Sequence, residues 1–297
     1  MNKPLQYWDR YNEKICEDQV YADWFIKWCY EKKIGKVFLD YFFSKKKFNI
    51  LYGLYKTSKL SLKQIQKDIE DYSVDMDLFK RTPFRSYSDF FLREFNDGIR
   101  SFPEDETYMG AFGEGRVLAF NSIEEDHKYP VKGEYLTPEL LLGNSQIAKE
   151  FIGGPIIIIR LCPIDYHHFH YPVSGKVLER YKLTGNYHSV NVLALKCKAD
   201  IFVKNEREVT VIENENFGKM AYIEVGAMCV GKIIQNNPKN STCTKGELKG
   251  HFEFGASTVI LMGQKEKWTP SDDILNHSDK NIESYIKLGD EIAKLKD

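Results

Sequence analysis

The sequence lacks a long apolar segment. Its longest purely apolar runs, such as Ile156–Ile159 and Val259–Met262, are four residues long, whereas a membrane-spanning helix needs about 20 apolar residues. Residues 1–20 are polar and carry charges of both signs, so the apolar centre of a secretory signal is missing as well. We therefore expect a protein that does not span a bilayer, while contact with a membrane surface stays open.

The sequence also lacks closely spaced cysteines. No two of its six cysteines lie closer than 13 positions apart; they stand at 16, 29, 162, 197, 229 and 243. This spacing excludes a CxxC metal or redox motif. Because no secretory signal is seen, we expect a reducing compartment and free thiols.

An excess of charge of one sign is missing too. Lys and Arg number 42 against 43 Asp and Glu, which argues against a general attraction to nucleic acid. The balance is uneven locally, because positions 27–47 hold seven lysines and only two acidic residues. Aromatic residues are abundant at 14%, enough apolar surface to exclude a disordered chain.

Hydrophobic periodicity divides the chain into two parts. Residues 1–105 have mostly helical spacing, and residues 106–297 have short β-rich runs separated by Gly, Pro and Asn. Strands are predicted around 115–120, 154–161, 175–183, 188–195, 207–213, 221–235 and 251–262, and helices around 138–150 and 281–294. We expect an α+β fold in which N-terminal helices pack on a mostly antiparallel core of the barrel or sandwich kind.

The densest chemical signal is the segment DYHHFHYPVSG at 165–175, which holds His167, His168 and His170. Histidines suit general acid–base catalysis near neutral pH. A metal site would need a further ligand such as His188, Asp165 or Glu224, and the spacing is not a strong metal motif. Alternatively, one or two of these rings only bond local carbonyl groups.

Two other segments hold candidate residues. In HFEFGASTVILM, Ser257 follows a small, flexible step, so it is either a nucleophile or the residue of a β-bulge. In GAFGEGRVLAF, Glu114 stands between glycines ahead of a predicted strand, but the glycine spacing does not make a dinucleotide fingerprint.

The aromatic, lysine-rich stretch at 20–48 has two interpretations. It is either a core-packing helix with a solvated basic face, or an interfacial helix on anionic lipid. In the second case each basic residue would contribute ~1 kcal/mol near the charged surface.

Taken together, these segments resemble the phosphatidylserine decarboxylase family. SDFFLREFNDGIRSF at 88–102 looks like the family's FFxRxxxxxxRP-type segment, and AFGEGRVL at 111–118 stands at the place of its SPxDGxxL motif. RLCPIDYHHFHYPVSGKV at 160–177 resembles DYHRFHxPVxG, and EVGAMCVGKI at 224–233 resembles VGAxxVGxI. FGAST at 254–258 stands where the family has GGST or LGST.

The resemblance implies a proenzyme that cleaves itself between Ala256 and Ser257. Ser257 Oγ would attack the carbonyl of Ala256 and move the acyl group from nitrogen to oxygen. β-Elimination would then free a chain ending at Ala256, and hydrolysis would release ammonia and leave a covalent pyruvoyl group at position 257 as the cofactor. Residues 257–297 would form the small chain, and the carbonyl would serve as electron sink when CO2 leaves the substrate.

The resemblance also implies roles for individual residues. His170 and Ser257 match two members of the family's Asp-His-Ser set for self-cleavage, and Glu114 stands at the Asp position. His167 matches the histidine assigned to decarboxylation. No metal is implied.

The implied activity is conversion of phosphatidylserine to phosphatidylethanolamine by a homodimer bound peripherally at the cytoplasmic face of the cell membrane, with no nucleic-acid partner. Two departures concern the self-cleavage residues: Glu114 replaces Asp, and Ala256 replaces Gly. A third is His168, which replaces Arg. Alternatives are a soluble decarboxylase of a free amino acid with the same fold, an uncleaved, non-catalytic lipid-binding homologue, and a metal protein built on the histidine cluster.

Overall fold

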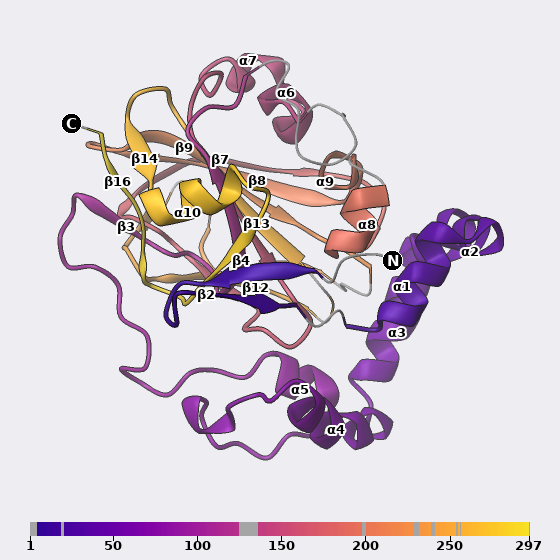
Figure 1. Ribbon diagram of the computed structural model, residues 1–297. Coiled ribbons are helices and arrows are strands. Elements are labelled where there is room, and N and C mark those ends of the chain that lie inside the picture. Colours follow the sequence, from indigo (N-terminus) through magenta and orange to yellow (C-terminus); the bar gives the residue numbers. More distant parts are fainter. Residues whose placement is uncertain are drawn as a thin grey trace.

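The chain is described by a computed structural model (Figure 1) that covers residues 5–18, 21–124, 136–197, 200–228, 232–238, 241–253, 255 and 257–296. Sixteen strands and ten α-helices occur in these ranges, so the expected α+β class is confirmed.

The N-terminal part begins with a hairpin of two short strands, β1 (Gln6–Asp9) and β2 (Lys14–Glu17), where helical spacing was predicted. Helical segments follow: α1 (Asp23–Glu31), α2 (Lys33–Phe38), the π-helical turn η1 (Leu39–Phe43), α3 (Lys46–Lys56), η2 (Lys59–Leu62), α4 (Lys63–Asp71), η3 (Met76–Leu78) and α5 (Tyr87–Phe91). Figure 1 shows α1, α2 and α3 as an arm at one side of the β region, with α4 and α5 below it.

Most strands belong to one large sheet with the order β11-β7-β8-β9-β13-β5-β4-β15-β1-β2. All its pairings are antiparallel except that of β1 with β15. The strands not yet delimited are β4 (Gly115–Phe120), β5 (Ile156–Leu161), β7 (Gly175–Leu183), β8 (Arg207–Asn214), β9 (Gly218–Val225), β11 (Thr242–Cys243), β13 (Ser257–Gly263) and β15 (Glu283–Ile286). In the described residues the sheet is open, so the core is not a closed barrel.

Two three-stranded sheets and several short helices complete the β region. The sheets have the orders β10-β12-β6 and β14-β16-β3. Their strands are β3 (Tyr108–Gly110), β6 (His168–His170), β10 (Ile233–Gln235), β12 (Leu248–Phe252), β14 (Trp268–Pro270) and β16 (Glu291–Leu295). The helices are α6 (Pro138–Leu142), α7 (Ser145–Ala148), α8 (Val192–Cys197), α9 (Ile201–Lys204) and α10 (Asp272–Ser278).

The main core lies in the centre of the large sheet. Every residue of β5 and β13 is buried, and these two strands pair along Ser257–Met262. β4 alternates buried and half-buried positions, as expected for a strand with one face on the core. The central position of β13 anchors the segment that follows the expected cleavage point.

Besides the N-terminal hairpin, two elements predicted in the β region have the wrong secondary structure. Residues 188–195 were expected to form a strand, but α8 begins at Val192. Residues 281–294 were expected to form a helix, but they contain β15 and the start of β16. The predicted helix at 138–150 is present as two short helices, α6 and α7, separated by Gly143 at φ +61°.

Candidate active site

Ser257 is the first residue of the central strand β13. It pairs with Leu161 of β5, and the next residue, Thr258, pairs with Val225 of β9. The side chain of Ser257 is fully buried, and its Oγ has no hydrogen-bond partner in the described part of the chain. A buried hydroxyl without a partner is costly to the fold, and here it leaves the Oγ free of competing hydrogen bonds. Ala256 lies outside the described residues.

Gly255 precedes this pair with a backbone φ of +136°. An L-residue rarely adopts this conformation, whereas glycine does so readily. The backbone freedom that the family's glycine would supply at position 256 is therefore present one residue earlier in this chain.

His167 lies against the same segment. Its Nδ1 bonds the carbonyl oxygen of Asp165 at 2.9 Å, and because a carbonyl only accepts, we assign the ring proton to Nδ1. The other nitrogen, Nε2, is buried and has no hydrogen-bond partner in the described chain. The Phe91 ring stacks on the imidazole at 3.8 Å between centroids, and the Gly255 backbone approaches the ring. Burial holds the pKa of His167 well below its usual range, so Nε2 presents a lone pair.

His170 is held differently. Its Nδ1 bonds the carbonyl oxygen of Gly246 at 2.9 Å, and the Tyr166 hydroxyl donates to Nε2 at 3.3 Å. Burial lowers the pKa of His170. Both ring nitrogens are thus occupied, and the described contacts do not join His170 to Ser257.

Glu114 lies at the start of β4, where four donors converge on its carboxylate. Arg100 binds both oxygens, Nε to Oε2 at 2.6 Å and Nη2 to Oε1 at 2.8 Å, and the Tyr285 hydroxyl and the Leu288 N–H each donate at 3.0 Å. Within the described chain no contact joins Glu114 to His170. Tyr285 and Leu288 belong to the segment after Ser257, so Glu114 links the two parts that cleavage would separate.

His168 takes no part in this arrangement. Its Nε2 bonds the Leu92 carbonyl oxygen at 3.1 Å, and its ring stacks on Tyr166 at 4.8 Å. Burial lowers the pKa of His168 to about 4. In the described ranges, no group of three His, Cys, Asp or Glu side chains is arranged to hold a metal ion.

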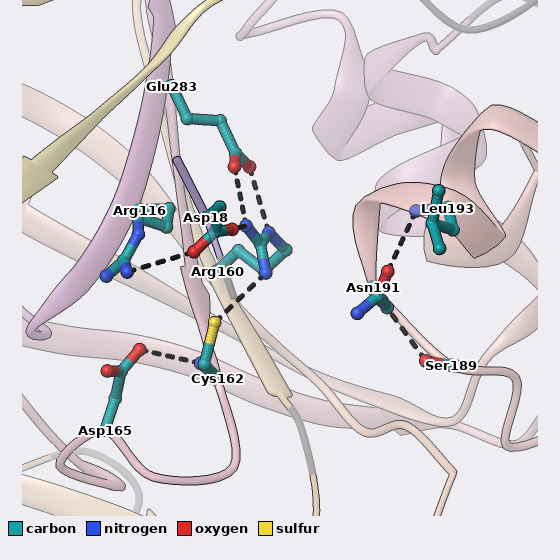
Figure 2. Close-up of polar contacts among 9 residues, drawn as sticks. All are labelled: Asp18, Arg116, Arg160, Cys162, Asp165, Ser189, Asn191, Leu193 and Glu283. Carbon is teal, nitrogen blue, oxygen red and sulfur yellow. Dashed lines mark hydrogen bonds and ion pairs between the residues drawn. The ribbon is translucent and has the colours of Figure 1, made fainter. Parts of the chain in front are cut away.

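A buried charge cluster next to Ser257 was not predicted (Figure 2). Arg160 of β5 binds both oxygens of Glu283 at 3.0 and 2.6 Å and Asp18 at 3.0 Å, and its Nη1 contacts Cys162 Sγ at 3.2 Å. Asp18 also accepts from Arg116 at 3.1 Å. An arginine at the end of the run IIIIR was the sequence signal for a buried, paired charge.

A cavity of about 420 Å³ joins this cluster to the N-terminal arm. Gly255, Leu161 and Cys162 line it, and so do aromatic residues of the arm, among them Phe25 and Phe43. The cavity therefore connects the cleavage segment with the apolar helices, which the sequence had placed in separate regions.

Comparison with known proteins finds a family model and several relatives that carry the same description. The family model described as phosphatidylserine decarboxylase matches residues 87–294. A protein of Clostridium novyi (strain NT), named phosphatidylserine decarboxylase proenzyme, is 37% identical over 284 residues, which is 95% of this chain and 96% of that protein. Proteins with the same name from Clostridium botulinum (strain Hall) and Clostridium perfringens (strain SM101) are 37% and 36% identical over 291 residues, 97% of this chain and 99% of each relative.

Proposed function

The chain belongs to the phosphatidylserine decarboxylase family, and we propose that it is a proenzyme that cleaves itself before Ser257 and then converts phosphatidylserine to phosphatidylethanolamine and CO2. The observation that carries the proposal is a pair of buried groups without partners in the described chain, Ser257 Oγ and His167 Nε2, with the Gly255 backbone near the His167 ring. Leaving these atoms without partners costs stability and keeps both of them available for a reaction.

Self-cleavage uses the hydroxyl of Ser257 as nucleophile. Its Oγ is free of competing hydrogen bonds, and strand pairing on both sides fixes the backbone that follows it. A base must take the hydroxyl proton. His170, which the family pattern assigns to this step, must first exchange the Tyr166 hydroxyl at Nε2 for the serine, whereas His167 Nε2 is already free.

After cleavage the small chain 257–297 remains in the fold. Its first strand, β13, is hydrogen-bonded between β5 and β9. Glu283 with Arg160, and Tyr285 with Glu114, add polar contacts across the two chains. The two chains therefore stay associated without a covalent link.

A pyruvoyl group derived from Ser257 fits this position. The site is buried, and His167, whose Nε2 has no partner in the described chain, lies near the backbone of Gly255. The group supplies an electron-accepting carbonyl when it is present. His167 Nε2 would first take up a proton, for which the ammonium group of the substrate is a source, and would then deliver it to the substrate carbon in place of the carboxyl group.

The substrate is a lipid rather than a free amino acid. Gly255 and aromatic residues of the arm line the same cavity, and the arm exposes large apolar side chains to solvent. They are Trp24, Ile34, Val37, Phe38, Tyr41, Phe42, Ile50, Leu51, Leu54, Tyr55 and Leu60. Lysines at positions 27–47 accompany them, the combination that binds an anionic membrane surface.

This arrangement supports peripheral attachment to a membrane surface, and its cytoplasmic face stays a prediction. None of the helices in the described ranges is long and apolar enough to cross a bilayer. The homodimer that the family resemblance implied stays a prediction.

Two measurements test the proposal. Intact-mass spectrometry should give two chains that split after Ala256; a single mass for the full chain would instead support an uncleaved, non-catalytic homologue. Flotation with phosphatidylserine vesicles should recover the protein with the lipid. Decarboxylation of free amino acids without vesicle binding would favour the soluble decarboxylase.

A further inference from the structure

We propose that the side chains of Ser189 and Asn191 bind the phosphodiester of the phospholipid head group, an inference that rests on the proposed function. Both residues line the cavity that also contains Gly255. No family motif identified in the sequence includes them.

The orientation of Asn191 is fixed by its own loop. Its Oδ1 accepts the backbone N–H of Leu193 at 2.9 Å, so the amide nitrogen is the end left for the cavity. Nδ2 has no hydrogen-bond partner in the described chain, and in Figure 2 it points toward the side on which Cys162 lies. Ser189 is 5% exposed; its Oγ accepts the N–H of Asn191 at 3.2 Å, which leaves the hydroxyl proton available.

The other polar groups of the cavity are already engaged. Arg160 is neutralised by Glu283 and Asp18, and Tyr21 donates its hydroxyl to Asp68. Burial raises the pKa of Cys162 to about 12, so its thiol stays neutral and donates only weakly. Apart from the indole of the largely exposed Trp24, Ser189 and Asn191 are therefore the neutral donors left for an anion.

The position of Ser189 and Asn191 favours binding of the substrate phosphate over binding of the substrate carboxylate. The Ser189 N–H bonds the Tyr30 hydroxyl of α1 at 2.8 Å, so the loop joins the cavity to the arm that would meet the lipid. In the phospholipid the phosphate lies between the serine that reacts near residue 257 and the acyl chains. Donors on the departing carboxylate would also stabilise the ground state more than the transition state, which would slow decarboxylation.

Binding of the phosphate and binding of the carboxylate by Asn191 predict different kinetic effects of its substitution. The charge of the phosphate does not change during the reaction, so losing its donors should raise KM and leave kcat nearly unchanged. Losing donors from the carboxylate should instead change kcat.

The test uses Asn191→Asp, which keeps an oxygen for the Leu193 N–H but replaces the amide donors with a negative acceptor. Asn144→Asp is the matched control, because Asn144 Oδ1 accepts the N–H groups of Gln146 and Ile147 and the residue does not line this cavity. Monomeric dihexanoyl phosphatidylserine is the substrate, which removes vesicle binding from the kinetics. Calorimetry with dihexanoyl phosphatidylethanolamine, which has the phosphate but no carboxylate, measures binding without turnover.

We expect Asn191→Asp to raise KM for the serine lipid and Kd for the ethanolamine lipid by about tenfold or more, the size of a hydrogen bond to a charged group. The change in kcat should stay within about twofold, and Asn144→Asp should match the wild type. An unchanged Kd would overturn the inference, and a changed kcat with unchanged Kd would assign Asn191 to the carboxylate. If the wild type binds the ethanolamine lipid through Asn191 but does not decarboxylate, the phosphate site stands and the proposed function fails.

Discussion

The N-terminal arm and the β region differ in the solvent exposure of their apolar side chains. In β5 and β13 every side chain is buried, whereas Tyr41 is 81% exposed and Trp24 75% exposed on the arm. In the β region the large sheet holds the proposed reacting groups in a buried core. The arm leaves apolar surface uncovered, which in a soluble chain marks a contact with something apolar. The function we propose assigns chemistry to one region and membrane contact to the other, and residues of both line the cavity.

The largest expected effect is at Ser257. Ser257→Ala should abolish cleavage completely and give only the full-length band on a gel, because the nucleophile is gone. Thr258→Val is the matched control, since Thr258 also has a buried hydroxyl without a partner in the described chain. If Ser257→Ala still yielded two chains, the proposed cleavage site would be wrong, and the proposed chemical role of the β region would lose its support.

His167 comes next. His167→Asn should lower kcat on phosphatidylserine by about 10²–10⁴, the usual contribution of a general acid or base. Cleavage should continue in this variant if His170 is the base for Ser257, and gel analysis reads that step separately. Loss of cleavage together with activity would mean that His167, with its free Nε2, serves both reactions.

The contact role of the arm can be tested by substituting Ile34, Tyr41 and Leu51 together with serine. Each is more than half exposed, so the melting temperature should stay near that of the wild type. Vesicle affinity should fall by about 100-fold or more, because a buried apolar side chain contributes about 1.5–3 kcal/mol.

Leu140→Ser is the control for this variant, since Leu140 is 46% exposed on α6 of the β region. It should bind vesicles like the wild type. Equal losses in both variants would remove the distinction between the two regions.

The burial of His168 predicts an acid-sensitive β region. Its pKa is lowered to about 4 from 6.5 by burial, so between these values the unfolded chain binds more protons and stability falls as pH falls. The loss approaches about 3 kcal/mol at pH 4. Urea unfolding of His168→Gln should show a smaller drop in unfolding free energy between pH 6.5 and 4 than the wild type; parallel curves would contradict this.

The smallest expected effect is at Ala256. Ala256→Gly should speed cleavage only a few-fold, because Gly255 already supplies a positive φ beside the cleavage point. Time-resolved gels of the purified proenzyme measure the rate. An increase of 100-fold would show that Ala256 itself restrains the reaction.

Much of the β region could be read from the sequence. The strands at 115–120 and 175–183 have the predicted bounds, because their periodicity of two and flanking glycines are local signals. The family motifs likewise identified Ser257, His167, His170 and Glu114 without any structure. The roles of these four residues stay predictions.

The misread elements depend on distant neighbours. β15 and β16 are short and polar, so their sequences also suit a helix; pairing with β4 and β1, and with β3 and β14, makes them strands. Residues 188–195 alternate like a strand, yet Asn191 bonds the Leu193 N–H and a helix begins at Val192.

The sequence by itself determined the α+β class, the family and the cleavage motif, because periodicity and motif spacing are local properties of the chain. Tertiary structure alone decided which groups are free to react. Both ring nitrogens of His170 and both carboxylate oxygens of Glu114 are hydrogen-bonded to other groups. His167 Nε2 and Ser257 Oγ have no partners in the described chain. The aromatic arm and Gly255 line one cavity. Burial and hydrogen-bond partners arise between segments far apart in the chain, so no local pattern encodes them.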